Sequence, residues 1–193
     1  MDTQQGLPIL PFASQEDWEK WLAEHHQTST GLWLKIAKKD TGIDTVTYAE
    51  ALDAALCHGW IDGQKGSFDD TFWLQKFTPR GPRSKWSKIN REKALALIES
   101  GRMKPSGLAA VEQAQSDGRW EQAYDSQSKA PVPEDLQREL DRNPEAAAFF
   151  ATLDSANRYA VLYRVQEAKK PETRARRIEK FIVMLNRGEK VHP

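Results

Sequence analysis

The sequence predicts an α+β fold: a small antiparallel sheet of about three strands packed with helices, followed by a helical C-terminal region. Two observations carry this prediction. From about residue 87 onward the pattern is helical, with prolines and acids at the helix starts. Before that point, three short β-rich runs lie between helical segments: 32–37, 60–67 and 71–78. We therefore expect an α+β domain over residues 1–127 and a helical region over 128–193 packed on it.

Capping residues mark the helices of the first part. Ser14 precedes acidic residues and begins a helix through about residue 26. Thr47 caps a second helix, which Gly59 ends. The next two β-rich runs are separated by F-D-D at 68–70, which favours a hairpin turn. The T-P-R-G-P run at 78–82 is expected to be a loop, because proline cannot continue the ladder.

The remaining helices are predicted from similar signals. Residues 87–99 and 105–117 form helices that end near glycines. A proline-containing connection, residues 128–133, leads to four more helix starts. Each start combines a proline or a capping residue with a nearby acid or serine; they lie at 133–135, 143–145, 154–155 and 171–172.

Composition narrows the function classes. The 193 residues carry 28 basic and 28 acidic side chains, so no overall field directs the protein to nucleic acid or membrane. The single cysteine, Cys57, excludes an intramolecular disulfide and suits a reducing compartment. No signal peptide is readable, and the longest apolar run, 146–151, is too short to cross a bilayer. We expect a cytoplasmic protein without membrane insertion.

The standard catalytic and metal signatures are absent from the sequence. It has no G-x-S-x-G, Walker or G-x-G-x-x-G motif, and its four histidines lack metal-site spacing with Cys57. Cys57 and His58 are adjacent on a predicted helix and point about 100° apart, a poor nucleophile–base pair. The acids of the first helix favour a solvated face over a cation site. We predict no catalytic residue, metal or cofactor.

The segment 71–91 is the strongest candidate for a binding surface. It contains no acid and has four aromatic residues among six basic ones: Lys76, Arg80, Arg83, Lys85, Lys88 and Arg91. It leads into a helix N-terminus, where unpaired N–H groups favour an anion. Ser84 and Ser87 add hydroxyls, and Arg80 and Arg83 can grip an oxyanion. Alternatively Ser87 only caps the helix, Trp86 packs on its start, and the charges are solvated.

A second motif, W-I-D-G at 60–63, lies on the preceding strand. Alternation places Trp60 and Asp62 on one face. Asp62 could pair with an arginine of the 79–85 loop, either orienting a ligand or forming a structural ion pair. Gly63 indicates a bulge or a close approach.

Three motifs together resemble the YdeI/OmpD-associated family, whose bacterial members are often labelled bacteriocin-protection proteins. They are W-I-D-G at 60–63, F-T-P-R followed by S-x-W-S-x-x-N over 77–90, and A-K-K-P-E-T-R-x-R-R-I at 168–178. The resemblance covers nearly the whole chain. It implies an N-terminal part like the YjbR/CyaY-like superfamily and a helical C-terminal region. It brings no catalytic residues and no iron site.

Three functional hypotheses follow. The leading one is a non-enzymatic binding or stress-protection protein that takes a small anionic ligand or a protein partner at residues 76–91. A second is nucleic-acid binding by segment 71–91 and the basic tail, 169–190. A third is an enzyme with Asp62 as base beside Arg80. The predicted ligand-binding residues are Trp60, Asp62, Arg80, Arg83, Ser84, Trp86, Ser87 and Asn90. The ligand and the oligomeric state are left open.

Overall fold

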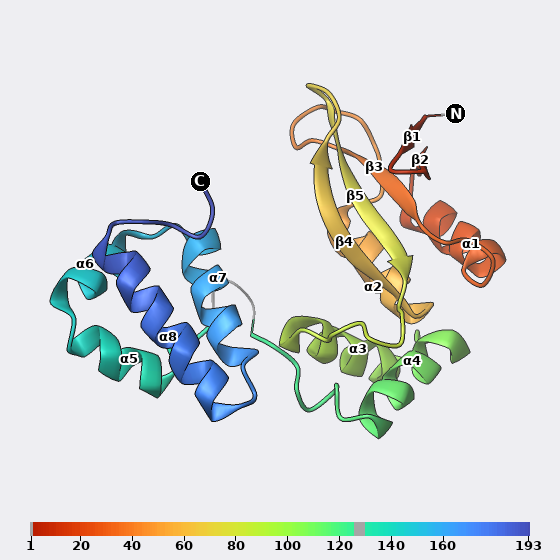
Figure 1. The fold of residues 1–193 in the computed structure, drawn as a ribbon. Coiled ribbons are helices and arrows are strands. Elements are labelled where there is room, and N and C mark those ends of the chain that lie inside the picture. The colour runs from red at the N-terminus through yellow and green to blue at the C-terminus, as the bar shows by residue number, and fades with distance from the viewer. Residues whose placement is uncertain (1, 126–129) are drawn as a thin grey trace. The chain divides into compact units, whose positions relative to one another are not determined.

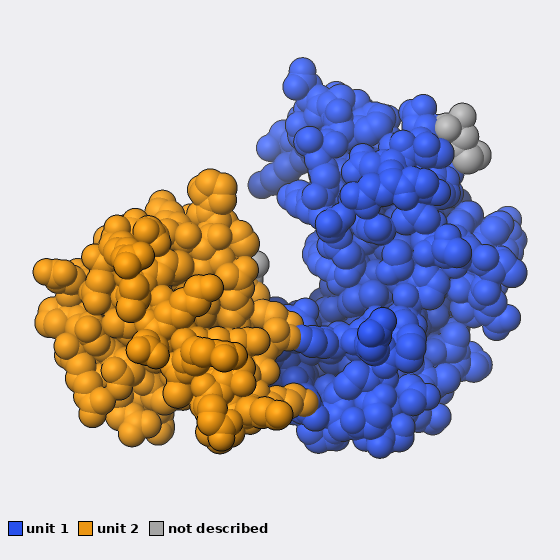
Figure 2. All heavy atoms as spheres, in the orientation of Figure 1, with its two compact units in different colours: residues 1–124 blue, residues 125–193 orange. Residues whose placement is uncertain are grey.

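The computed structural model of the chain describes residues 2–125 and 130–193. It divides into two compact units, residues 1–124 and 125–193 (Figure 2). Each unit has its own hydrophobic core. The predicted boundary between residues 127 and 128, with the first residues of the predicted connection, lies outside the described residues.

The N-terminal unit alternates strands and helices before it ends in two helices (Figure 1). Its capped starts are those predicted: Ser14 accepts a hydrogen bond from the Asp17 amide, and Thr47 forms a capping box with Glu50. In chain order the elements are β1 Thr3–Gln4, β2 Leu7–Pro11, α1 Gln15–His25, β3 Leu32–Ala37, α2 Tyr48–Cys57, β4 Trp60–Ser67, β5 Phe72–Pro79, α3 Lys88–Glu99 and α4 Pro105–Ser116.

The sheet has five strands in the order β1-β2-β3-β5-β4, which corrects the prediction of about three antiparallel strands. β2 and β3 are parallel, so the sheet is mixed. β2 is not predicted because Pro8 and Pro11 argue against a strand, yet proline is tolerated near a sheet edge. β1 has two residues, too few for a readable pattern. Gln5 and Gly6, both with positive φ, make the tight β1–β2 turn. The predicted hairpin is β4–β5, with a register shift beside Gly63, as expected for a bulge.

One face of the sheet meets α1 and α2 in an aromatic core. Trp18 of α1 lies 5.7 Å from Phe77 of β5 and 6.3 Å from Trp60 of β4, ring centre to ring centre. All three are almost fully buried. The chain has seven tryptophans, and every one falls within residues 1–124. This unit therefore relies on large aromatic side chains for its buried apolar area.

The C-terminal unit is helical, and all four predicted helix starts are confirmed. Its helices are α5 Glu134–Asp141, α6 Pro144–Thr152, α7 Ser155–Gln166 and α8 Pro171–Asn186. Asp154 caps α7 by accepting from the Asn157 amide at 2.7 Å, and the Asn157 side chain accepts from the His192 amide at 2.8 Å. Aliphatic and phenylalanine side chains form the core, with Leu136 and Leu162 fully buried. Among the described residues, no helix is long and apolar enough to cross a bilayer.

Candidate functional site

Arg80 occupies the point where β5 gives way to the loop before α3. Its amide donates to the Gly59 carbonyl at 2.9 Å, which fixes the strand end beside the end of α2. Gly81 and Ser84 then form a tight turn, in which the Gly81 amide donates to the Ser84 hydroxyl at 3.0 Å. This turn brings Trp86 back against Arg80, and the guanidinium carbon lies 3.5 Å from the centre of the indole. The loop therefore wraps around a stacked arginine–tryptophan pair.

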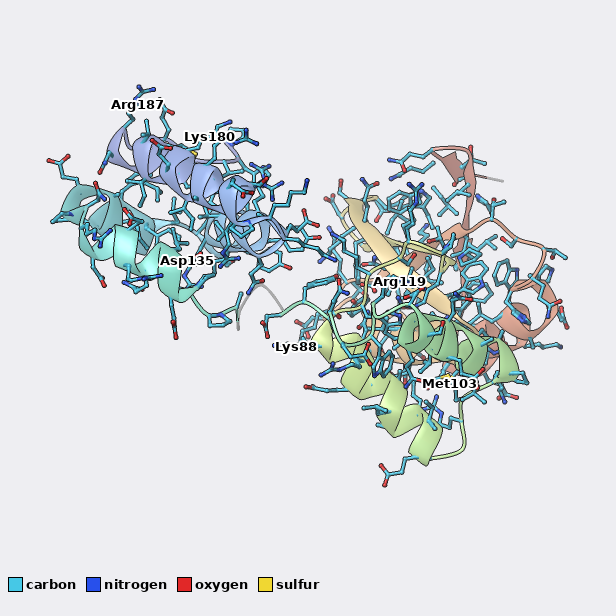
Figure 3. The ribbon with its side chains drawn as sticks, turned by 60° about the horizontal axis from the view of Figure 1, so that its bottom comes forward. Lys88, Met103, Arg119, Asp135, Lys180 and Arg187 are labelled. Carbon is cyan, nitrogen blue, oxygen red and sulfur yellow. The ribbon has the colours of Figure 1, made fainter. Side chains whose placement is uncertain are left out.

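Arg119 holds this loop from the segment after α4 (Figure 3). Its Nη1 donates to the Ser84 carbonyl at 2.8 Å, while its other nitrogens grip the Asp117 carboxylate. The Tyr124 amide donates to the Trp86 carbonyl at 3.0 Å. Residues more than thirty positions downstream thus fix the loop around Arg80.

Three buried nitrogen donors in this pair have no hydrogen-bond partner among the described residues: Nε and Nη2 of Arg80 and Nε1 of Trp86. Nη1 of Arg80 donates to the Lys85 carbonyl at 3.3 Å. Burial lowers the pKa of Arg80 to about 10, although the nearby Asp62 charge acts to raise it. An unsatisfied buried donor costs about 1–3 kcal/mol. Such a group in a folded protein therefore calls for an explanation such as a ligand or an ordered water.

Asp62 lies on the helix-covered face of β4, opposite Phe77 in the strand register. Its carboxylate accepts from the Tyr48 hydroxyl at 2.7 Å. Burial, followed by this hydrogen bond, raises the pKa of Tyr48 well above its ordinary value. Among the described residues Asp62 forms no ion pair with Arg80 or Arg83, so the predicted pairing is not made.

Three of the predicted site residues lie elsewhere. Trp60 is 1% exposed in the aromatic core, and its indole donates to the His26 carbonyl at 3.1 Å. Arg83 is exposed at the surface of the loop. Asn90 is on the core-facing side of α3 with Ala94.

The N-terminus of α3 is closed by protein groups. Ser87 accepts from the Asn90 amide at 3.1 Å, which makes it the helix cap. The Lys88 amide donates to the Tyr124 carbonyl at 2.8 Å. The prediction that arginines and free helix amides meet at this junction is therefore wrong, because protein groups already bond these amides.

The aromatic and basic side chains of segment 71–91 do not gather on one surface. Phe77 and Trp86 are buried, at 0% and 2% exposure. Phe72 and Trp73 are neighbours on β5 and point to opposite faces of the sheet. Each has a lysine of an adjacent strand over its ring: Lys35 at 4.1 Å over Phe72 and Lys65 at 4.3 Å over Trp73. This arrangement gives no continuous platform for stacked bases.

The sequence did not single out Tyr48, Arg119 or Tyr124 as members of this site. Tyr48 is the first residue of α2, where only its capping neighbour was informative. Tyr124 reaches the site through an isolated bridge to Ser87. Both contacts join segments far apart in the chain, and no local motif signals them.

The cysteine and histidines give no metal centre. Cys57 is 4% exposed, and burial raises the pKa of its thiol. His58 lies 5.1 Å from His26, ring centre to ring centre, and burial lowers its pKa to about 4. Among the described residues no group of three or more histidine, cysteine or acidic side chains could hold a metal ion.

Comparison with protein families gives two matches. Residues 10–110 match a family described as "Domain of unknown function (DUF8412)", and residues 129–188 match "Bacteriocin-protection, YdeI or OmpD-Associated" (OmdA). Searches of the curated proteins and of the solved structures gave no match. The second match confirms the predicted resemblance for the C-terminal region. The first carries no YjbR/CyaY name, so that likeness stays a prediction.

Proposed function

We propose that this chain, which belongs to the family described as domain of unknown function DUF8412 and carries an OmdA domain at its C-terminus, is a non-enzymatic binding protein. Its N-terminal unit would hold a small oxyanion, a carboxylate or a phosphate group, against Arg80 and Trp86. One observation carries this proposal: three buried N–H donors on two stacked side chains lack an acceptor among the described residues.

The free part of Arg80 is the part suited to such a ligand. Nε and Nη2 form one edge of the guanidinium, and their two N–H bonds run nearly parallel. That edge matches two oxygens of one carboxylate or phosphate. The third oxygen of a phosphate, or a second polar group of a carboxylate ligand, could accept from the Trp86 indole.

The C-terminal unit contains the same arrangement in its occupied form. Arg174 donates from Nη1 to the Val165 carbonyl at 2.9 Å. Its Nε and Nη2 meet the Asp135 carboxylate at 2.5 and 2.8 Å. Arg80 also donates from Nη1 to a backbone carbonyl, but its Nε and Nη2 meet no acceptor among the described residues. This internal example supports a carboxylate-like group as the missing partner of Arg80.

The wider role we propose is protection or stress response in the cytoplasm. The description of the family matched by residues 129–188 names bacteriocin protection. The lone Cys57 suits a reducing compartment. We also propose a YjbR/CyaY-like relationship for the N-terminal unit, supported by its helix, strand, helix and hairpin order from α1 to β5.

An enzymatic role is a second candidate, because no backbone donor in the described part of the chain binds the Asp62 carboxylate. Its described partner is the Tyr48 hydroxyl, which leaves Asp62 able to accept a proton beside the Arg80 cation. Asp62→Asn would then abolish turnover of a bound carboxylate ligand while leaving its binding intact. Unchanged ligand composition after incubation with the wild type removes this candidate.

The binding proposal is tested on the full chain with sodium benzoate and with inorganic phosphate, each by calorimetric titration and thermal shift. We expect at least one anion to raise the melting temperature of the wild type through preferential binding to the folded state. Arg80→Met should abolish the effect. Arg80→Lys, which keeps the charge but not the two-pronged edge, should weaken binding at least tenfold.

Arg83→Met is the matched control, since Arg83 is an exposed arginine of the same loop. It should bind as the wild type does. Equal binding by wild type and Arg80→Met, or no response to either anion, contradicts the proposal.

A further inference from the structure

The C-terminal unit has a second polar feature, a groove of about 500 Å³ bounded by the end of α7, by α8 and by residues 190–191. Its volume is within the range of about 300–1,000 Å³ typical of ligand sites. We call it the basic groove. Four cationic side chains line it: Arg164, Arg177, Lys180 and Lys190.

Positive charge exceeds negative charge around the basic groove. Glu167 is the acid in its lining and accepts from the Tyr163 hydroxyl at 2.9 Å, and the Asp154 carboxylate interacts with the charge of Lys190. Arg177 donates to the Arg164 carbonyl, a contact that leaves its charge unneutralised. Neither Arg164 nor Lys180 forms an ion pair within the described parts of the chain. In a chain with zero net charge, this is a local excess that favours an acidic partner.

The cations are spread too widely for one small anion. Arg177, Lys180 and Met184 lie along α8 over seven residues, or about 10 Å at 1.5 Å per residue. Figure 3 shows Lys180 and Arg187 projecting outward from this helix. A single carboxylate or phosphate meets one or two of these positions, whereas an extended chain places about three residues in the same span. The partner must carry several charges in a row.

The floor of the basic groove is apolar. Phe181, 6% exposed, lies there with the partly buried Met184 and Val191. A floor of this kind receives an apolar side chain, and the flexible thioether of methionine adapts to its shape. Stacking of nucleic-acid bases needs an exposed aromatic face, which the buried Phe181 does not offer.

We propose that the basic groove docks an acidic segment of a partner protein, with an apolar side chain on the floor and carboxylates on either side. This surface is independent of the oxyanion site, because each is built from residues of a different unit. Its affinity should fall as salt is added, since rim charges of this kind are screened.

The test uses the full chain and a fluorescein-labelled acidic peptide, EEFEEFE, followed by fluorescence anisotropy. We expect saturable binding that weakens at least tenfold in the double variant Arg164→Glu, Lys180→Glu. The matched control is Arg138→Glu, Arg142→Glu, which makes the same charge change on α5. It should bind within twofold of the wild type. A peptide with serine in place of both phenylalanines should bind more weakly to the wild type.

Several outcomes would overturn the proposal. They are absence of binding, equal weakening in the two double variants, or tighter binding of a single-stranded DNA oligonucleotide of equal charge. Circular dichroism confirms that each variant is folded. Arg80→Met should bind the peptide normally, so failure here is distinguishable from failure of the oxyanion proposal.

Discussion

Arg80 in the N-terminal unit and Arg174 in the C-terminal unit begin with the same contact, a hydrogen bond from Nη1 to a backbone carbonyl. They differ at the opposite edge. In Arg174 this edge donates to the Asp135 carboxylate, whereas in Arg80 it meets no acceptor within residues 2–125 and 130–193. The contrast extends further. The buried side-chain nitrogens without partners in the described residues belong to His58, Arg80 and Trp86, all in the N-terminal unit.

In the described part of the C-terminal unit, the buried side-chain nitrogens and oxygens have hydrogen-bond partners. Asn157, 2% exposed, donates to Asp154 and accepts from the His192 amide. The difference indicates a division of roles. The described part of the N-terminal unit contains buried nitrogens without hydrogen-bond partners, which costs stability. The C-terminal unit instead presents positive charge in a surface groove.

The largest expected effect concerns His58 and acid. The unfolded chain protonates this histidine near pH 6.5, but the folded protein does so only near pH 4. The contribution of neutral His58 to the free energy of unfolding should therefore be fully present above pH 6.5. The free energy of unfolding should fall by about 3 kcal/mol as the pH drops to 4. Urea unfolding followed by tryptophan fluorescence at a series of pH values measures this loss.

In His58→Gln the loss between pH 6.5 and 4 should shrink by most of that amount. His25→Gln serves as the control and should keep the wild-type profile. If the two variants share one profile, the burial of His58 is not what makes the N-terminal unit acid-sensitive.

Removal of Arg174, whose three guanidinium nitrogens all donate hydrogen bonds, should have the next largest effect on stability. Arg174→Met leaves the half-buried Asp135 without its partner and should lower the free energy of unfolding by about 2 kcal/mol. Far-UV circular dichroism in urea is the measurement. Arg142→Met is the comparison, because its pair with Glu139 is 72% exposed on the arginine side and should be worth less than about 0.5 kcal/mol.

The smallest expected effect is an increase in stability, caused by replacement of Arg80. Without added anion, Arg80→Met removes a buried cation with two unpartnered nitrogens and should raise the free energy of unfolding by up to about 1 kcal/mol. Chemical unfolding in an anion-poor buffer measures it. A clear loss of stability would show that Arg80 is already satisfied in the folded protein, and the comparison with Arg174 would fail.

Helix positions could be predicted from the sequence because their signals are local. Ser14, Thr47 and the prolines at 144 and 171 mark helix starts within one turn of chain. β2 could not be predicted, since its prolines are acceptable only because of where the strand lies in the sheet.

The candidate site divides in the same way. Arg80, Ser84 and Trp86 fall in one short loop, and their grouping was readable from that loop. Tyr48 and Arg119 reach the site through tertiary contacts. Trp60 shares a face of β4 with Asp62, as alternation predicts, but the aromatic core buries its ring and leaves it unavailable to a ligand.

Because all seven tryptophans lie within residues 1–124, tryptophan fluorescence reports on one of the two units. Tryptophan emission, excited at the red edge of protein absorption, monitors the N-terminal unit and carries no signal from α5 through α8. An oxyanion arriving beside Trp86 should change that emission without any added dye. A peptide settling in the basic groove would leave it unaltered and must bring its own fluorophore.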